Sequence, residues 1–273
     1  MAQVIAAVIG LMMGSFLTVV AERLHANRSF MLGRSQCNHC RKQLTWWELM
    51  PVIGYLVLRG RCRRCHSTIP WQYPVFELVA AASYTAVTWL FFPQWSILIP
   101  NLLVVTFLLV LCYSDWLYQE FPAVALYGAL LVSAVAGYLN YQHEQVVVSA
   151  SDSWLWWLSS SRQAWQSVVL GGGVAAGLLA MLAVPSRERW MAYGDVWLAG
   201  ALGLWVGYPL SLFALATAFY TGAVVGVIQL VTRRAQSDHR LAFGPFLILG
   251  AIVVLVWGSN LFSAIMNLWG VAI

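Results

Sequence analysis

Charged side chains are scarce in this sequence: only 9% of its 273 residues are Asp, Glu, Lys or Arg, and only ten are acidic. Hydrophobic residues make up 61%, which excludes an ordinary soluble domain and a disordered chain and indicates a polytopic membrane protein. We therefore expect an all-α fold with about eight transmembrane helices, embedded in the lipid bilayer. Apolar runs of about 20 residues, enough to span a bilayer, begin near Val4, Tyr73, Ile97, Pro122, Val168, Asp195, Ser211 and Phe243.

Two familiar signals are missing. The first apolar run has no basic segment before it and no small-residue cleavage site after it, so we expect a retained helix and not a cleaved signal peptide. The sequence also lacks a glycine-rich cofactor motif of the type found in soluble enzymes. A cofactor site therefore cannot be located from such a motif.

The basic residues are distributed unevenly between the loops. Of the 15 Lys and Arg residues, Arg162 alone falls on one side of the eight-helix arrangement, and the other fourteen fall on the opposite side. Basic loops remain in the cytoplasm, so we expect residues 23–70, 185–193 and 232–242 to be cytoplasmic and both termini to lie outside. This topology accounts for the net charge of +5 and gives no indication of nucleic-acid binding.

Four of the five cysteines form two Cys-x2-Cys pairs in the first cytoplasmic loop. This spacing is typical of a zinc ribbon, in which four thiolates close a tetrahedral site. Two disulfides or four free thiols are the alternatives, and the reducing cytosol disfavours the disulfides. Cys112, inside an apolar run, is expected to be a packing residue. We predict a structural Zn²⁺ site with the ligands Cys37, Cys40, Cys62 and Cys65.

Two aspartates stand at the ends of apolar runs. Asp115 closes one run and Asp195 opens another, and the topology places both at the cytoplasmic boundary, where a charged group is costly without a partner or water. The simpler interpretations are that Asp195 is a helix N-cap and that Asp115 marks the point where a helix leaves the membrane. The alternative is a catalytic pair that shares one proton, with one carboxylate activating water and the other acting on a peptide carbonyl. Ion transporters also place paired aspartates in membranes.

Nearly the whole chain resembles the bacterial type IV prepilin peptidases. Gly14-Ser15-Phe16-Leu17 matches the opening segment of the family, and the stretch from Cys37 to Glu77 is the most specific part of the match. Asp115 and Gly194-Asp195 stand at the positions of the two catalytic aspartates, and Phe243-Gly244-Pro245 matches the signature of the last helix. Ala192 and Trp197 depart from the family pattern, which usually has Gly and often has Lys at these positions.

The resemblance implies an aspartic endopeptidase of the bacterial inner membrane, with Asp115 and Asp195 as catalytic residues. Its substrates would be type IV prepilins and type II secretion pseudopilins, cut on the cytoplasmic side after a glycine. The resemblance also implies N-methylation of the new N-terminal residue, usually Phe, with S-adenosylmethionine. A carboxylate near the membrane boundary could bind the sulfonium or the substrate amine, so Glu22 and Glu77 are candidates, with a helix-end salt bridge to an Arg as the alternative.

From these patterns we expect three segments: a first transmembrane helix over residues 1–22, a zinc-binding loop over 23–71, and a transmembrane peptidase core over 72–273. Two other functions remain open. A catalytically silent, zinc-containing assembly factor would account for Ala192 and Trp197. An ion transporter would use Asp115 and Asp195 as a relay but would leave the cysteine loop unexplained.

Overall fold

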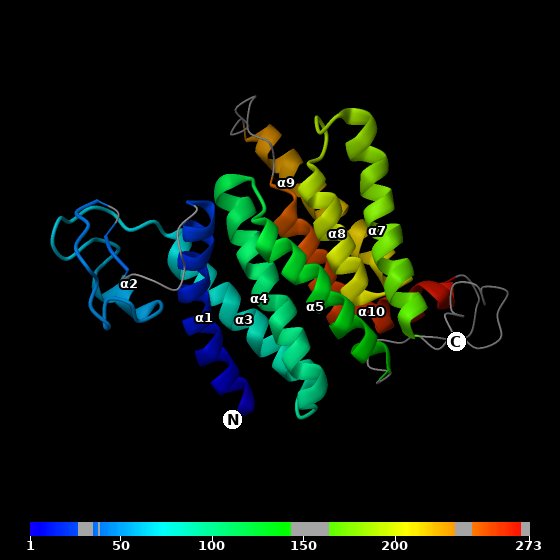
Figure 1. The fold of residues 1–273 in the computed structure, drawn as a ribbon, viewed down its shortest axis with the longest axis horizontal. Coiled ribbons are helices and arrows are strands. Elements are labelled where there is room, and N and C mark those ends of the chain that lie inside the picture. Colours follow the sequence, from blue (N-terminus) through cyan, green and yellow to red (C-terminus); the bar gives the residue numbers. More distant parts are fainter. Residues whose placement is uncertain (27–34, 38, 143–163, 233–241, 269–273) are drawn as a thin grey trace. The chain divides into compact units, whose positions relative to one another are not determined.

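The computed structural model describes residues 1–26, 35–37, 39–142, 164–232 and 242–268, and the side chains up to residue 258 (Figure 1). Within these ranges the secondary structure is helical, apart from two isolated β-bridges. The chain divides into two compact units, Met1–Leu117 and Tyr118–Ile273. The helices are α1 Ala2–His25, α2 Ile53–Val57, α3 Gln72–Phe91, α4 Trp95–Tyr118, α5 Ala123–Gln142, α7 Ala164–Ser186, α8 Tyr193–Val206, α9 Leu210–Val231 and α10 Gly244–Leu268.

Eight of these helices correspond to the eight apolar runs, and the protein is an all-α, multi-pass membrane protein. Among the described residues, six helices are long and apolar enough to cross a membrane: α1, α3, α4, α5, α7 and α9. The apolar part of α10 with described side chains is Gly244–Gly258. α8 has only 14 residues, fewer than the roughly 20 that a span needs. Arg162 and much of the 232–242 loop lie outside the described residues.

In the first unit, two glycines allow α1 to pack closely on α3. A Cβ atom at Gly10 would lie 2.7 Å from the Cα of Ala81, and one at Gly14 would lie 2.8 Å from the Cα of Glu77. Small residues of this kind let membrane helices approach at backbone distance. The contact places Ser15 of α1 against the first turns of α3, where Glu77 lies.

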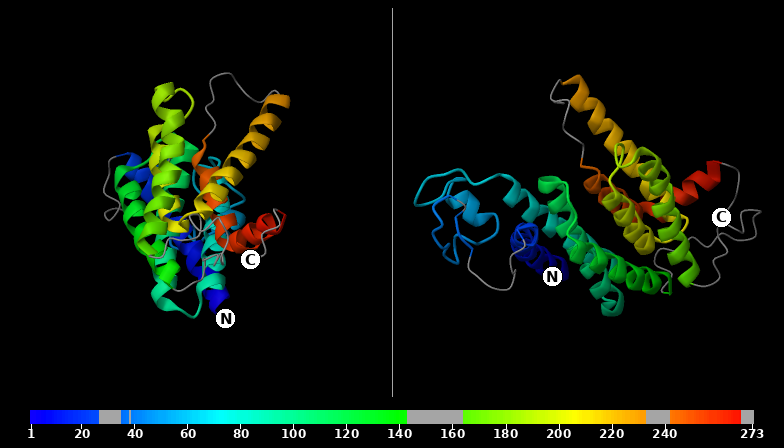
Figure 2. Two further views of the ribbon diagram at one scale, coloured as in Figure 1. Left: turned by 90° about the vertical axis from the view of Figure 1, so that its right-hand side faces the viewer. Right: turned by 45° about the horizontal axis from the view of Figure 1, so that its top comes forward.

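In the second unit, glycine contacts also set the packing. The backbones of Gly171 on α7 and Gly203 on α8 approach so closely that a Cβ on either would lie within 2.4 Å of the carbonyl oxygen of the other. Gly137 of α5 approaches the Leu204 carbonyl, and Gly250 of α10 approaches the Ala214 carbonyl of α9 in the same way. α7 and α8 accordingly run side by side in each view (Figures 1 and 2).

Candidate functional site

The four predicted zinc ligands come together in the loop between α1 and α3. Their sulfur atoms all lie within 4.8 Å of one another, and the sulfurs of Cys37 and Cys65 are 3.8 Å apart. A tetrahedron of thiolates about 2.3 Å from a zinc ion has edges of roughly this length. The four cysteines are free of disulfides. This cluster therefore has the chemistry and the spacing to hold a metal ion.

The two Cys-x2-Cys pairs fold in the same way. The N–H of Cys37 donates to the Lys42 carbonyl, and the N–H of Cys62 donates to the Ser67 carbonyl, each at 2.9 Å. The residue after each second cysteine, Arg41 or His66, has a φ of 55°, which closes each turn tightly. Each pair thus forms a small hairpin that presents two sulfurs, and the two hairpins together supply four.

The thiols of this cluster differ in acidity. The backbone N–H groups of Cys40 and His39 lower the pKa of Cys37 to about 6, and Ser67 lowers the pKa of Cys65. The Lys42 N–H favours the Cys40 thiolate, but burial and the neighbouring cysteines outweigh it and raise the pKa of Cys40 to about 11. Four thiolates this close cannot all ionise without a compensating charge, which a bound cation supplies.

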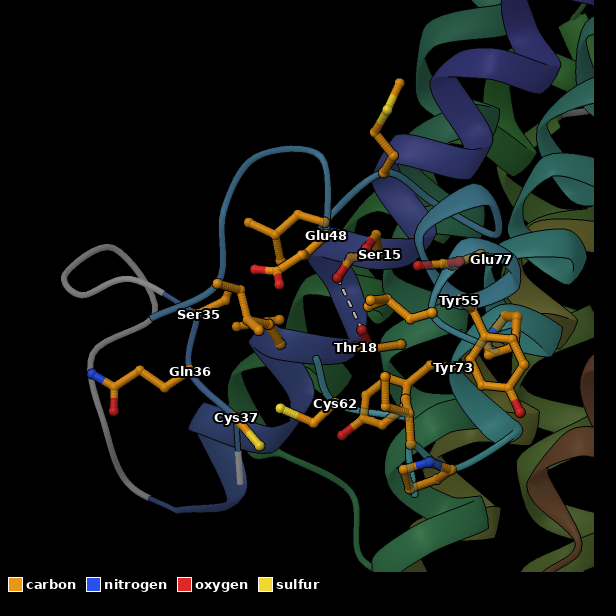
Figure 3. A pocket seen from close by; sticks show the side chains of 18 of the residues that line it. Ser15, Thr18, Ser35, Gln36, Cys37, Glu48, Tyr55, Cys62, Tyr73 and Glu77 are labelled. Atoms are coloured by element: carbon orange, nitrogen blue, oxygen red, sulfur yellow. Dashed lines mark hydrogen bonds between the residues drawn. The ribbon is translucent and has the colours of Figure 1, made fainter. Parts of the chain in front are cut away.

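Beside the cysteine cluster lies a cavity of about 500 Å³, which the sequence did not reveal. It is enclosed by α1, the first turn of α3 and the loop from residue 35 to 70 (Figure 3). Its volume is that of a pocket for a cofactor-sized molecule. Most of the lining surface is apolar, but the lining also includes three glutamates, Glu22, Glu48 and Glu77, and the basic side chain of Arg63. Figure 3 shows Tyr55, Tyr73, Cys62 and Glu77 around this space.

Glu22 lies in the last turn of α1 and is half-buried. Its Oε1 atom accepts hydrogen bonds from two tyrosine hydroxyls, those of Tyr73 on α3 and Tyr113 on α4, the latter at 3.1 Å. Tyr113 also packs edge-on against Phe76, with ring centroids 4.6 Å apart. Arg28 and Arg34 lie outside the described residues, so a salt bridge of Glu22 with a nearby Arg stays an untested alternative.

Glu77 has a different environment. Its side chain is buried, and its Oε2 atom accepts a 2.7 Å hydrogen bond from the N–H of Val52. Val52 has a φ of 58°, a conformation that is strained for a β-branched residue. Glu77 thus fastens the loop to α3 at a strained point, in addition to lining the cavity.

Asp115 lies in the last turn of α4 and is 5% exposed. The helix continues for three residues beyond it, and the interpretation that Asp115 marks the point where the helix leaves the membrane stays untested. The half-buried Cys112 stands one turn earlier, is not among the clustered cysteines, and fits the packing role predicted for it.

Asp195 lies in the first turn of α8 and is 6% exposed. The N-cap position belongs to Ala192, and no side chain caps the helix, so the interpretation of Asp195 as an N-cap is wrong. The N-terminal end of a helix nevertheless favours a negative charge in its first turn. Gly194 brings Phe121 close: a Cβ atom at Gly194 would lie 2.2 Å from the Phe121 ring.

Asp115 belongs to the first compact unit and Asp195 to the second. The first unit brings Glu22 and Glu77 together around one cavity, which Cys37 and Cys62 of the cysteine cluster also line. Sequence reasoning missed Tyr73 and Tyr113, the partners of Glu22. No pattern in the sequence links either tyrosine to Glu22, because they lie 51 and 91 positions away from it.

Two family models match successive parts of the chain. The model described as "Bacterial Peptidase A24 N-terminal domain" matches residues 8–91, which include the cysteine cluster and both glutamates. The model described as "Type IV leader peptidase family" matches residues 102–227, which include both aspartates. The two matches together cover most of the chain.

Curated relatives match over nearly the whole length. Proteins named prepilin leader peptidase/N-methyltransferase from Aeromonas hydrophila, Pseudomonas putida and Neisseria gonorrhoeae are 29%, 28% and 26% identical to the chain. The alignments cover 92%, 97% and 97% of this chain and 89%, 94% and 93% of the relatives. No solved structure matches the chain. On these matches, the chain belongs to the type IV leader peptidase family.

Proposed function

We propose that the protein is an aspartic endopeptidase of the bacterial inner membrane. It removes the leaders of type IV prepilins and type II secretion pseudopilins at the cytoplasmic face. The observation that carries the proposal is the presence of two nearly buried aspartates at helix ends, both inside the part of the chain that matches the leader peptidase family. Basic residues of the loop, among them Arg41, Arg61 and Arg63, support its cytoplasmic location.

The helix ends favour different roles for the two aspartates. Asp195 stands at the N-terminal end of α8, where the helix dipole stabilises an ionised carboxylate, and Asp115 stands at the C-terminal end of α4, where it does not. In the proposed pair, ionised Asp195 takes a proton from the attacking water. Protonated Asp115 donates a hydrogen bond to the scissile carbonyl and polarises it.

The chain between Asp115 and Phe121 limits how far apart the two aspartates can lie. Phe121 follows Asp115 by six residues and packs against Gly194, the neighbour of Asp195. Six residues span about 20 Å when fully extended. This short tether supports a shared catalytic site.

Asp115→Asn and Asp195→Asn test the peptidase. Each removes one carboxylate with almost no change of shape, so we expect leader removal from a co-expressed prepilin to fall by roughly 10³-fold or more. Metal content and membrane insertion should remain unchanged, which shows that the variants fold. Full processing by either variant would refute the aspartic mechanism. If the wild-type protein also leaves prepilins uncut, the silent assembly factor becomes the better account.

We propose that the metal held by Cys37, Cys40, Cys62 and Cys65 is zinc and that its role is structural. Four thiolates complete a tetrahedral zinc shell and leave no open position for a substrate. Purified, unchelated protein should contain about one zinc per chain, measured by elemental mass spectrometry. Protein that carries no zinc after such a preparation would contradict the assignment.

We further propose that the protein methylates the N-terminal amine that cleavage creates, as the names of its relatives suggest. The 500 Å³ cavity beside the cysteine cluster is the proposed site of S-adenosylmethionine. Two of its three carboxylates, those of Glu22 and Glu77, suit a sulfonium and an ammonium ion, and Tyr55 and Tyr73 add aromatic rings to the lining. When bound, the cofactor supplies an electrophilic methyl group. The residues of the cavity bind it, orient the amine and exclude water.

A further inference from the structure

Glu22 and Glu77 line the same cavity, but their carboxylates have different hydrogen-bond partners. The Oε2 atom of Glu77 accepts the Val52 N–H, and the same side chain hydrogen bonds with Ser15. Both hydrogen bonds that Glu22 forms within the described part of the chain, in contrast, go to its Oε1 atom. The Oε2 atom of Glu22 therefore has capacity for a ligand, whereas Glu77 is engaged in holding the loop on α3.

The position of Glu22 connects the cavity with the helix that carries Asp115. Tyr113, which donates to Glu22, precedes Asp115 by two residues on α4. Two residues of an α-helix rise about 3 Å and turn by about 200°. Tyr113 and Asp115 therefore lie at nearly the same depth but point to nearly opposite sides of α4, with Glu22 on the Tyr113 side.

The new amine forms where the leader is cut and must then meet a methyl donor. Tyr113 donates a hydrogen bond to Glu22 and lies at nearly the same depth as Asp115. An amine that moves from the Asp115 side of α4 to the Tyr113 side would therefore meet Glu22 without changing its depth in the membrane. Its half-buried carboxylate offers an ammonium group a charge-assisted hydrogen bond, and the two tyrosines fix its direction.

We propose that Glu22, held by Tyr73 and Tyr113, binds the N-terminal ammonium of the cleaved pilin and acts as its base in methyl transfer. This inference rests on the proposed function. The ammonium gives one proton to the Glu22 carboxylate. The freed nitrogen lone pair then forms a bond to the methyl carbon, while the carbon–sulfur bond breaks and its electron pair remains on sulfur as a neutral thioether. The methylated nitrogen carries the positive charge, and the proton on Glu22 passes to water.

The test compares two leaderless pilin peptides that begin with Phe, one with a free N-terminus and one N-acetylated. Their affinities for the full-length protein in lipid nanodiscs are measured by fluorescence anisotropy in the presence of S-adenosylhomocysteine. A charge-assisted contact to the ammonium gives the free peptide roughly 10- to 100-fold tighter binding. Glu22→Gln should abolish this preference and lower methyl transfer, while leader removal continues.

Glu48→Gln is the matched control. Glu48 also lines the cavity, but its Oε2 atom accepts hydrogen bonds from the N–H and the hydroxyl of Thr45 within the loop. The tyrosines that connect Glu22 with α3 and α4 do not hold it, so the free-amine preference should survive. The affinities of both peptides are measured on the same variant, so a loss of binding that affects both equally cancels in their ratio. If Glu22→Gln binds neither peptide, Glu22→Asp is measured instead, because it retains the negative charge. A preference for the free-amine peptide in Glu22→Asp supports the proposal, and its loss overturns the proposal.

Three results would overturn the inference: a preference that persists in Glu22→Gln, one that Glu77→Gln removes while Glu22→Gln does not, or none in the wild-type protein. These outcomes are separate from failure of the proposed function. A wild-type protein that leaves prepilins uncut contradicts the peptidase. One that binds the free amine selectively but transfers no methyl group contradicts methylation and leaves the amine site standing.

Discussion

The cysteine loop and the second unit are stabilised by different means. The loop from residue 35 to 70 contains only a five-residue helix, and its shape depends on two hairpins, the sulfur cluster and the hydrogen bond from Val52 to Glu77. The second unit is built from long apolar helices that meet backbone to backbone at glycines. Loss of the sulfur cluster should therefore unfold the loop. The second unit should instead be most sensitive to larger side chains at its glycine contacts.

The largest expected effect is on the loop. Cys62→Ser removes the most buried of the four ligands, and metal binding supplies roughly 10 kcal/mol or more to the folding of such small modules. We expect the metal to be lost, the loop to become sensitive to protease, and methylation to fall much further than leader removal. Elemental analysis, limited proteolysis and mass spectrometry of the pilin N-terminus measure these effects.

Cys112→Ser is the control for this prediction, because Cys112 lies outside the cluster and should leave the metal content unchanged. Equal losses of cleavage and methylation in Cys62→Ser would show that the loop supports the whole protein and not methyl transfer in particular.

A smaller effect is expected from added volume between α7 and α8. Gly203→Ala places a methyl group 2.3 Å from the Gly171 carbonyl oxygen, and neither backbone can yield without moving its helix. We expect a loss of about 1–3 kcal/mol in stability, seen as a lower unfolding temperature in nanodiscs with the zinc content unchanged. Gly173→Ala on α7 makes the same change where no atom lies within 4 Å and should have no such effect. Equal stability of the two variants would contradict the packing argument.

Gly194→Ala tests the contact beside Asp195. The new methyl group would meet the Phe121 ring at 2.2 Å, so the ring or the first turn of α8 must move. We expect leader removal to slow by about tenfold, equivalent to about 1.4 kcal/mol in the barrier. Adding Phe121→Leu should restore part of the rate, because it vacates the space. A double variant as slow as the single one would show that the defect does not come from this contact.

The smallest effect is expected at Ala192, the departure from the glycine usual in the family. Ala192 has φ −75° and ψ 150°, an extended conformation open to any residue. Ala192→Gly should therefore change the rate of leader removal by less than about twofold, since glycine gains nothing there. A large gain in rate would mean that alanine impairs the enzyme for a reason other than backbone conformation.

Helix positions were predictable from the sequence, because long apolar runs and the prolines between them leave few alternatives. Predicted starts at Tyr73, Pro122 and Ser211 lie within one residue of the starts of α3, α5 and α9. The four-cysteine cluster was predictable for a similar reason, since paired Cys-x2-Cys spacing restricts the geometry. The three-segment division and the catalytic roles of the aspartates stay predictions.

The cavity and the contacts of Glu22 could not be predicted. Tyr73 and Tyr113 lie 51 and 91 positions from Glu22 in the chain, and periodicity carries no information about such pairs. The length of α8 was also misjudged. One apolar stretch runs from Asp195 through α9, and its composition does not show that α8 ends at Val206, where Gly207 has a φ of 78°.

The shortness of α8 affects how water can reach a peptide bond in a membrane. Its 14 residues rise about 21 Å, whereas the hydrocarbon layer is about 30 Å thick. A helix that begins at the cytoplasmic surface would end well inside the lipid, and one that reaches the outer surface would begin at a depth that lipid tails normally fill. Neighbouring helices bury most of α8, so the space beyond its short end is filled by protein or by water and not by lipid tails. Hydrolysis consumes a water molecule at every turnover, and a water-filled space at the end of α8 that carries Asp195 would provide its route.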